Sequence, residues 1–449
     1  MVCDLTRGMH VSDKTIGIGL IGLGTVGSGV AQLLSDEAEL YARRLGARLE
    51  VRRVLVRDVD KAIRQQVVPP QCITTDAEAF FATADMPIVV EVAGGKGVVS
   101  GFVRQALESG RHVVTANKAL LAAEGVELFT LARRQGVSVA FEASVCGGIP
   151  VLTALQFGLM ANRVQGLYGI LNGTCNYILT EMTRQQKPYD VALAEAQAQG
   201  FAEADPTLDV SGRDAAEKLA ILASLAYGMQ VRGGDVTAEG IDTLQLDDIR
   251  FGAELGYDIK LLGISEHWPG EAAVSANVQP CFIHRTDLIA QVAGSFNALL
   301  VKGHAAGPTM YYGRGAGRLP TASAVVSDLL NVASGWYGQA FRALQLTPDC
   351  SGPARLVPVD DLWSRFYIRV NALDRPGTMA QITAALGDHG ISLSAVLQHE
   401  VNSGQFVPVV ITTHQARRGD VAAALARIES LDTTSGKPVL LRIVDLPHT

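Results

Sequence analysis

The segment from Lys14 to Leu34, KTIGIGLIGLGTVGSGVAQLL, limits the fold of this chain more than any other, because it contains the pattern G-x-G-x-x-G twice. A loop that binds a dinucleotide needs a buried strand before it and the start of a helix after it. The copy that begins at Gly17 follows polar residues. The copy that begins at Gly22 follows an apolar run and leads into an amphipathic helix after Gly27. We therefore predict that the second copy holds a pyrophosphate.

The three glycines of the second copy have separate roles in such a loop. Gly22 makes the tight turn, Gly24 lets the backbone approach the phosphates, and Gly27 permits close packing of the helix on the strand. Backbone N–H groups at the start of the helix then face the anion. Gly17 and Gly19, which precede this loop, are expected to allow tight packing within the strand.

Short apolar runs alternate with helical patterns from Thr15 to about Ala143. The expected strands cover residues 16–22, 49–58, 86–95, 111–118 and 137–144, and the expected helices cover residues 28–46, 98–110 and 119–136. Alternation of strands and helices implies a Rossmann-type, doubly wound parallel sheet, so the predicted fold class is α/β.

The pattern changes after about Cys146. Strands are expected at residues 163–179, 272–283 and 295–303, with a long helix over 214–228, which indicates an α+β domain. Residues 347–361 are rich in Pro, Gly and Asp and are typical of a linker, and a small βαββαβ unit follows. The expected domains are 1–142 for nucleotide binding, 143–320 for the α+β part, 321–342 for a helix returning to the first domain, 343–364 for the linker, and 365–449 for the last unit.

The composition excludes several functional classes. The 449 residues carry a net charge of -7, whereas a nucleic-acid-binding face needs clustered Lys and Arg, so no nucleic-acid partner is expected. No apolar run reaches the roughly 18 residues of a membrane span. The six cysteines form no C-x-x-C pair and the polar N-terminus has no signal-peptide core, so a reducing cytoplasm is expected.

Two residues at the end of the second expected strand bear on the choice of cofactor. An acidic side chain here would bind the ribose of NAD, whereas an arginine would accommodate the 2′-phosphate of NADP. The strand ends with Arg57 followed by Asp58, so the sequence leaves both open. We favour NADP, with NAD as the alternative. Either residue would also suit the role of an ordinary exposed charge at a strand end.

Two lysines are candidates for chemistry. Lys118 comes directly after a strand, at the carboxyl edge where sheets of this kind bind ligands. Lys218 lies four residues after Asp214, on the same face of a helix that Ser211 is expected to cap. The pair is either a surface ion pair or a carboxylate that orients a proton-transferring lysine. Apolar neighbours indicate that the helix is largely buried, but spacing alone does not decide between the two interpretations.

Three further stretches place polar groups near turns. Asn172, Gly173 and Thr174 end an expected strand, and such a turn can offer amide and hydroxyl donors to a carboxylate. Glu142 precedes a glycine-rich turn that is either a plain loop or a turn whose carbonyls coordinate a hard cation. Another glycine-rich stretch lies ahead of a helix expected to begin near Thr321, which would be a second helix start facing an anion.

Five stretches together resemble homoserine dehydrogenase over nearly the whole chain. They are GLIGLGTVGSGV, TANKALLA, LNGTCNYIL, GFAEADPTLDVSGRDAAEKLAIL and YYGRGAGRLPTASAVVSDL, in that family's order and spacing. The resemblance implies NAD(P)H-dependent reduction of L-aspartate 4-semialdehyde to L-homoserine, on the branch towards threonine, methionine and isoleucine. It identifies residues 143–320 as a catalytic and dimerisation domain and residues 365–449 as an ACT domain. Since the chain starts almost at the dinucleotide fold, it resembles the monofunctional kind.

The resemblance implies roles for individual residues. At the cofactor the resemblance implies Gly24, Thr25, Val26, Lys118 and Gly317, and the patterns described above add Gly22, Gly27 and Arg57. Those expected at the substrate are Glu203, Asp209, Asp214, Thr174 and Gly173, with Glu203 binding the ammonium group. Lys218 looks like the proton donor to the aldehyde oxygen, oriented by Asp214, and Lys118 is the second candidate for that role.

The resemblance also implies a sodium site and an effector site. The expected sodium ligands are Glu142 and the backbone carbonyls of Val145, Gly147 and Ile149. The ACT-like segment implies feedback, with L-threonine as the expected effector near Asp374 and Gly377. Ser392 stands where many effector-binding ACT domains carry asparagine. A homodimer or homotetramer is expected.

Two other functional classes stay open at this level. Aspartate-semialdehyde dehydrogenase shares the cofactor fold but requires a nucleophilic cysteine with a histidine base, and Cys146 is the only placed candidate. A protein that senses nucleotides and amino acids without catalysis would use only the Rossmann and ACT parts. It would leave the grouping of acids with Lys218 unexplained.

Overall fold

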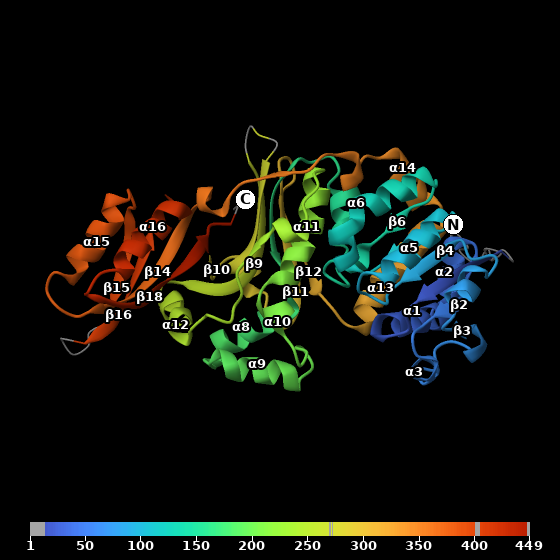
Figure 1. Cartoon of the computed structure of the whole chain (residues 1–449), viewed down its shortest axis with the longest axis horizontal. Helices are drawn as coiled ribbons and strands as arrows, with labels where there is room; N and C mark the ends of the chain where they lie inside the picture. Colours follow the sequence, from blue (N-terminus) through green and yellow to red (C-terminus); the bar gives the residue numbers. More distant parts are fainter. Residues whose placement is uncertain (1–13, 269–270, 272, 400–404, 447–449) are drawn as a thin grey trace, which may run out of the picture. The chain divides into compact units, whose positions relative to one another are not determined.

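The computed structural model describes residues 14–268, 271, 273–399 and 405–446 (Figure 1). The chain divides into two compact units. Unit 1 contains Met1–Arg163, Ala220–Gly233 and Tyr311–Pro353, and unit 2 contains Val164–Leu219, Gly234–Met310 and Ala354–Thr449. Residues 1–13, 400–404 and 447–449, which belong to the first and last expected domains, lie outside the described residues.

The described part of unit 1 is built on a six-stranded parallel sheet in the order β3-β2-β1-β4-β5-β6. Its strands are β1 (Thr15–Ile21), β2 (Arg48–Leu55), β3 (Ile73–Thr74), β4 (Ile88–Glu91), β5 (His112–Thr115) and β6 (Val139–Ala140). The predicted doubly wound parallel sheet is confirmed, although β3 was not predicted. The strand order reverses between β1 and β4, where sheets of this kind bind ligands beyond the carboxyl ends of their strands.

The helices of unit 1 come from both the start and the later part of the chain. They are α1 (Thr25–Asp36), α2 (Ala38–Leu45), α3 (Val59–Ile63), α4 (Ala77–Phe81), α5 (Val98–Glu108), α6 (Lys118–Arg134), α7 (Val151–Thr153), α13 (Arg318–Ala333) and α14 (Trp336–Ala343). The single helix predicted over residues 28–46 is wrong, because the backbone of Glu37 leaves the helical region (φ -111°, ψ 20°) and separates α1 from α2.

The glycines of the first loop are required by close backbone contacts. A Cβ on Gly27 would lie 2.1 Å from the carbonyl oxygen of Gly22, and Gly22 itself has a φ of +98°. A Cβ on Gly24 would meet nothing within 4 Å. The predicted packing role of Gly17 and Gly19 is confirmed, since a Cβ on Gly17 would lie 1.9 Å from the Asp85 carbonyl oxygen and one on Gly19 would lie 2.7 Å from neighbouring side chains.

Unit 2 contains one continuous sheet with the main path β12-β11-β7-β9-β10-β18-β14-β16-β15. Its strands are β7 (Val164–Ile170), β8 (Thr237–Ala238), β9 (Tyr257–Trp268), β10 (Ala273–His284), β11 (Phe296–Gly303), β13 (Arg355–Leu356), β14 (Trp363–Leu373), β15 (Leu393–Gln398), β16 (Phe406–Thr413), β17 (Ala416–Arg417) and β18 (Thr434–Val444). Strand β12 (Gly307–Arg314) begins in unit 2 and ends in unit 1. Its helices are α8 (Gly173–Gln185), α9 (Tyr189–Ala198), α10 (Thr207–Val210), α12 (Leu246–Glu254), α15 (Thr378–Asp388) and α16 (Arg418–Glu429). Helix α11 (Arg213–Tyr227) begins in unit 2 and ends in unit 1.

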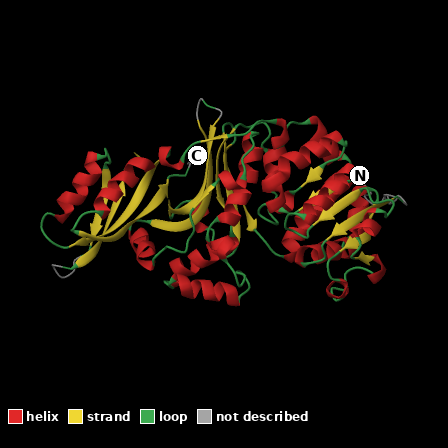
Figure 2. Ribbon diagram, viewed as in Figure 1, coloured by secondary structure: helices red, strands yellow, loops and turns green. Residues whose placement is uncertain are grey.

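The predicted C-terminal βαββαβ unit is confirmed by the order β14, α15, β15, β16, α16 and β18. Both helices lie on one face of its strands (Figures 1 and 2), where side chains such as Ile382 and Val421 form a buried core. Strand β18 pairs with β10, which joins this part to the rest of the sheet. A buried ion pair strengthens the junction, because Arg369 of β14 donates to both carboxylate oxygens of Asp248 in α12 at 2.6 and 3.1 Å.

One predicted strand, residues 163–179, is partly wrong. Strand β7 ends at Ile170 and α8 begins at Gly173, because the side chain of Asn172 accepts a hydrogen bond from the Cys175 N–H at 2.8 Å and caps the helix. A short apolar run cannot by itself distinguish a buried strand from a buried helix. Strands β9 and β12 were not predicted. Within the described part of the chain, each helix is too short or too polar to cross a bilayer.

The glycine contacts predict that one substitution in this loop lowers the free energy of unfolding and that a neighbouring one does not. Gly27→Ala would force Cβ into the Gly22 carbonyl, so we expect a loss of about 1–3 kcal/mol in the free energy of unfolding, as for overpacked sites. Gly24→Ala serves as the matched control, because its Cβ enters open space and its φ of -77° suits alanine. Urea denaturation of both variants without cofactor measures the difference. Equal stability of the two variants would contradict the packing described here.

Candidate active site

The first turn of α1 lies at the carboxyl end of β1 and suits an anion. Its N-cap is Gly24, no side chain caps its N–H groups, and both Gly24 and Thr25 are exposed. The open space at Gly24 lets a phosphate approach the backbone, and the helix dipole favours negative charge there. The residues present therefore fit the pyrophosphate of a dinucleotide.

A buried carboxylate organises the loops next to this turn. Glu91, at the end of β4, is fully buried and accepts hydrogen bonds from the N–H groups of Ala93 and Gly94, both at 2.9 Å. Its second oxygen accepts a hydrogen bond from the Thr115 hydroxyl of β5 at 2.7 Å. A Cβ on Gly22 would lie 2.7 Å from the Ala93 nitrogen, so the loop that Glu91 holds is packed directly against the glycine loop. Sequence reasoning missed Glu91, because it lies inside an apolar strand.

Lys118 is the first residue of α6 and is partly buried. Asn117 precedes it as the N-cap, accepting a hydrogen bond from the Leu120 N–H at 3.1 Å. The Asn117 amide donates to the Gly95 carbonyl at 2.6 Å, which ties the start of α6 to the loop after β4. The structure therefore places Lys118 at the same sheet edge as the loop of Gly22–Gly27.

Arg57 and Asp58 are predicted as the last residues of a strand, but β2 ends at Leu55 and both lie in the turn after it. Their side chains have different surroundings. The side chain of Asp58 accepts a hydrogen bond from the Lys61 N–H at 2.9 Å and caps α3. Arg57 is exposed in the turn between the strand and this helix. The carboxylate that would have bound a ribose is thus engaged in a cap, whereas the guanidinium faces solvent.

Gly317 is the N-cap of α13, whose start at Arg318 is three residues earlier than predicted. Helix α13 packs along α1, so closely that a Cβ on Gly29 would lie 2.8 Å from the Arg318 carbonyl oxygen. The stretch before Gly317 contacts the other glycine-rich turn, because a Cβ on Gly147 would lie 2.5 Å from the Gly315 carbonyl oxygen. Unit 1 therefore brings Gly317 next to α1 and to the predicted cation turn.

Glu142 is buried, and its carboxylate already accepts three hydrogen bonds. They come from the Leu152 N–H at 2.8 Å and from the N–H and hydroxyl of Thr153 at 2.7 and 2.5 Å. Burial raises the pKa of Glu142, and burial with the charge of Glu142 raises the pKa of Asp328 well above its usual range. The Ile149 carbonyl accepts a hydrogen bond from the Val151 N–H at 2.7 Å.

Val145 and Gly147 lie in the same turn as predicted. No group of three or more His, Cys, Asp or Glu side chains could hold a metal ion within the described residues. A cation at this turn would therefore depend on Glu142 and backbone carbonyls, which suit a hard ion.

Lys218 and Asp214 form the centre of the candidate site in unit 2. The Lys218 ammonium donates to the Asp214 carboxylate and to the Leu171 carbonyl, both at 2.8 Å. Their side chains are only 14% and 9% exposed. The interpretation as a surface ion pair is therefore wrong, and a buried charge pair of this kind is expensive unless its hydrogen bonds are made. Ser211 does not cap this helix; it ends α10.

Asn172 connects this pair to a second carboxylate. Its amide donates to Asp214 and to Asp209, both at 2.8 Å, while its carbonyl oxygen caps α8. Burial raises the pKa of Asp209, although the Asn172 hydrogen bond lowers it. Thr174 lies in the first turn of α8, where its hydroxyl donates to the Phe201 carbonyl at 2.6 Å. We call Asn172, Asp209, Asp214 and Lys218 the acid–lysine cluster.

Four further predicted residues are not members of this cluster: Gly173, Glu203, Asp374 and Gly377. Gly173 begins α8 next to Asn172. Glu203 is exposed in the segment between α9 and α10. In the C-terminal part, Gly377 is the N-cap of α15, and Asp374 accepts a hydrogen bond from Gln398 of β15 at 3.4 Å.

Neither cysteine near the site suits nucleophilic chemistry. Cys175 is buried, and burial raises the pKa of its thiol well above the usual value. Cys146 is also fully buried, in a turn where its φ is 55°. The thiolate is the reactive form, and burial in apolar surroundings disfavours it.

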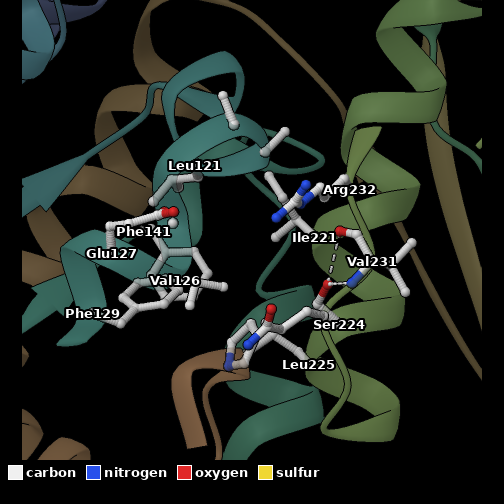
Figure 3. Close-up of a pocket in the computed structure, with 15 residues that line it drawn as sticks. Leu121, Val126, Glu127, Phe129, Phe141, Ile221, Ser224, Leu225, Val231 and Arg232 are labelled. Carbon is white, nitrogen blue, oxygen red and sulfur yellow. Dashed lines mark hydrogen bonds between the residues drawn. The ribbon is translucent and has the colours of Figure 1, made fainter. Parts of the chain in front are cut away.

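A separate cavity lies inside unit 1, between α6 and the last turns of α11 (Figure 3). It has a volume of about 70 Å³, and its walls include Leu121, Phe129 and Ile221. Glu127 and Arg232 approach it from opposite sides. None of the predicted site residues lines this cavity, so it is not part of the candidate site.

Comparisons with known proteins find the same family, homoserine dehydrogenase, over nearly the whole chain. The family model for homoserine dehydrogenase matches residues 150–330, the model for the homoserine dehydrogenase NAD-binding domain matches residues 22–142, and the ACT-domain model matches residues 366–432. Homoserine dehydrogenase of Neisseria gonorrhoeae is 41% identical over 438 residues, covering 96% of this chain and 99% of that protein. The Synechocystis enzyme is 42% identical over 436 residues, covering 96% of this chain and all of that protein.

A solved structure extends the similarity to three dimensions. The crystal structure of a homoserine dehydrogenase from Thiobacillus denitrificans has a TM-score of 0.91 at 43% identity and covers 97% of this chain and 99% of that chain. The fold described above is therefore similar to that enzyme in both units.

The acid–lysine cluster predicts a specific effect of Asn172→Asp. The new side chain keeps the cap on α8 but adds a negative charge between Asp209 and Asp214 and removes their shared donor, so their pKa values rise. Activity that needs ionised carboxylates is lost as pH falls through their pKa, so the acid limb of the pH–rate profile should move up by about one unit. Asn172→Ala is the comparison variant; it removes the donor without adding a charge, so its acid limb should move up less than that of Asn172→Asp. An unmoved limb in Asn172→Asp would argue against the cluster.

Proposed function

This chain belongs to the homoserine dehydrogenase family and is an NAD(P)-dependent oxidoreductase, and from that premise we propose that it interconverts L-aspartate 4-semialdehyde and L-homoserine. The observation that carries the proposal is the acid–lysine cluster, where the ammonium of Lys218, whose side chain is 14% exposed, is held by Asp214 and the Leu171 carbonyl. In biosynthesis the reaction would feed threonine, methionine and isoleucine.

We assign proton transfer to Lys218. A bound nicotinamide cofactor supplies the hydride that the reaction needs. Reduction of an aldehyde leaves negative charge on its oxygen, and the Lys218 ammonium can stabilise that charge and donate a proton. Asp214 and Leu171 fix the direction of the ammonium through two hydrogen bonds of 2.8 Å, so little reorientation is needed. Lys118, at the start of α6, is kept as the second candidate.

The substrate is a small zwitterion, so its recognition needs acids for the ammonium and donors for the carboxylate. We propose that Glu203, Asp209 and Asp214 face the ammonium group. Gly173 and Thr174 lie in the first turn of α8, where backbone N–H groups and the helix dipole favour a carboxylate. Glu203 is exposed in the segment before α10, so its carboxylate is accessible to a substrate that arrives from solvent, which supports its proposed role.

We further propose NADP as the preferred cofactor. The support is the contrast after β2, where Asp58 caps α3 while the Arg57 guanidinium stays exposed. A sodium ion at Glu142 with the carbonyls of Val145, Gly147 and Ile149 is also proposed. Its support is the burial of two carboxyl groups, Glu142 and Asp328, whose charges a nearby cation would offset.

We also propose a mode of regulation and an oligomeric state, both on the basis of the family assignment. L-threonine is proposed to bind the ACT domain near Asp374 and Gly377 and to inhibit by feedback. A homodimer or homotetramer in the cytoplasm is proposed, and the described cysteines are free thiols, which suits a reducing compartment. The rival assignment as a thioester-forming enzyme loses its support, because its candidate Cys146 is fully buried.

Lys218→Met should remove the proton donor while keeping the bulk of the side chain. We expect kcat for L-homoserine oxidation to fall by about 10²–10⁴-fold, because general acid–base catalysis typically contributes a rate acceleration of that size. The dissociation constant for the cofactor, measured by fluorescence, should stay unchanged. Arg213→Met, which removes an exposed cation from the same helix, is the control and should keep wild-type activity. A kcat near wild type in Lys218→Met would remove Lys218 from this role.

Arg57→Ala should shift cofactor preference from NADP towards NAD. Loss of a charge-assisted contact with the 2′-phosphate should lower kcat/KM for NADP by roughly tenfold or more and leave kcat/KM for NAD unchanged. Asp58→Asn keeps the cap on α3 and serves as the control, with no expected change in preference. Steady-state assays with each cofactor measure the ratio. An unchanged ratio in Arg57→Ala would contradict the assignment.

A further inference from the structure

A polar cavity of about 300 Å³ lies within unit 2, apart from the acid–lysine cluster. It is lined by the second half of α8, by β9 and by the segment after β10. The proposed substrate contacts on α8, Gly173 and Thr174, are in its first turn, whereas the cavity begins at Thr180. Thr183, which also lines it, is nine residues beyond Thr174, or about 14 Å along a helix. None of the residues assigned to the reaction lines this cavity.

The charge around the cavity is strongly unbalanced. Three cations line it, namely Arg184, Lys260 and Arg285, against one carboxylate, Asp258. That carboxylate is already paired, because the Arg285 guanidinium donates to it at 2.9 Å. Two positive charges are therefore left without a compensating acid among the lining residues.

Lys260 is the buried member of this group. It is 6% exposed, and its ammonium donates to the neutral Val292 carbonyl at 2.6 Å and to the Asn176 amide oxygen at 3.4 Å. The pKa of Lys260 is lowered to about 8, mainly by burial; the nearby Asp258 opposes this shift and the nearby Arg184 adds to it. A buried ammonium without a carboxylate in direct contact is costly, and an anion in the cavity would offset that cost.

The other donors at the cavity suit an oxyanion. Arg184 and Arg285 present planar guanidinium groups at exposed positions, and such groups bind phosphate and carboxylate oxygens through two hydrogen bonds. The hydroxyl-bearing Thr183 lies one residue before Arg184 on α8. The cavity thus combines one buried ammonium with two guanidinium groups reachable from solvent.

We propose that this cavity is a binding site for a phosphate dianion, either inorganic phosphate or the phosphoryl group of a small ester. Two unbalanced positive charges match a dianion, and a buried ammonium flanked by guanidinium groups matches several oxygens on one centre. The site is independent of the proposed reaction. It would be the second anion-binding site of the chain, after the nucleotide-binding loop at the start of α1.

The test is isothermal titration of the full chain with inorganic phosphate, in the presence of saturating NADP so that the nucleotide loop is filled. One saturable site is expected. Lys260→Met should weaken binding at least about tenfold through loss of a charge-assisted contact. Arg184→Gln should also weaken phosphate binding, and because Arg184 is exposed this substitution should leave folding intact. Lys437→Met, an exposed lysine of β18, is the control and should bind as wild type does.

Parallel titrations separate the two sources of phosphate. O-phospho-L-serine that binds at least as tightly as inorganic phosphate would identify an ester, and weaker binding would identify the free ion. Absence of phosphate binding, or equal affinity in wild type and in both cavity variants, would overturn the proposal. Succinate binding as tightly as phosphate would overturn the assignment to phosphate. Activity assays with L-homoserine on the same samples show separately whether the proposed reaction holds.

Discussion

The geometry of unit 2 around the proposed chemistry depends on one side chain, Asn172. Its amide holds Asp209 and Asp214 at 2.8 Å each, and its oxygen starts α8. Two carboxylates brought this close would repel each other and favour protonation unless a donor lies between them. With the amide in place, Asp214 stays available to hold Lys218. One residue thus sets the end of β7, the start of α8 and the direction of the ammonium on α11.

The sequence predicted those features that depend on local pattern. The glycine loop and the pairing of Asp214 with Lys218 are encoded by spacing within a few residues. The parallel sheet and the βαββαβ unit are encoded by the alternation of apolar runs and helical patterns along the chain. The structure adds that this pair is buried, which the apolar neighbours of α11 had suggested. Contacts between distant segments could not be predicted. Glu91 binds the loop after its own strand and Thr115 of another strand, and nothing in a run of apolar residues marks it.

The errors have physical causes as well. The apolar run over residues 163–179 predicts a strand because such runs look alike in buried strands and buried helices, but the cap at Asn172 starts a helix there. The helix predicted over residues 28–46 is divided at Glu37, where the sequence has no proline or glycine that would have indicated the end of a helix. The Asp58 carboxylate was a candidate for ribose binding, yet it caps α3, a short helix that the sequence did not reveal.

The continuous sheet of unit 2 links the C-terminal part to the acid–lysine cluster through paired strands, and the buried Arg369–Asp248 pair ties β14 to α12. The account nevertheless rests on Lys218 as the proton donor. Chemical rescue of Lys218→Ala by small primary amines tests this most directly. The account predicts that added amines restore turnover and that the rescued rate changes systematically with the pKa of the amine. A folded, cofactor-binding variant whose turnover does not respond to any amine, or rescue that is indifferent to amine pKa, would contradict it.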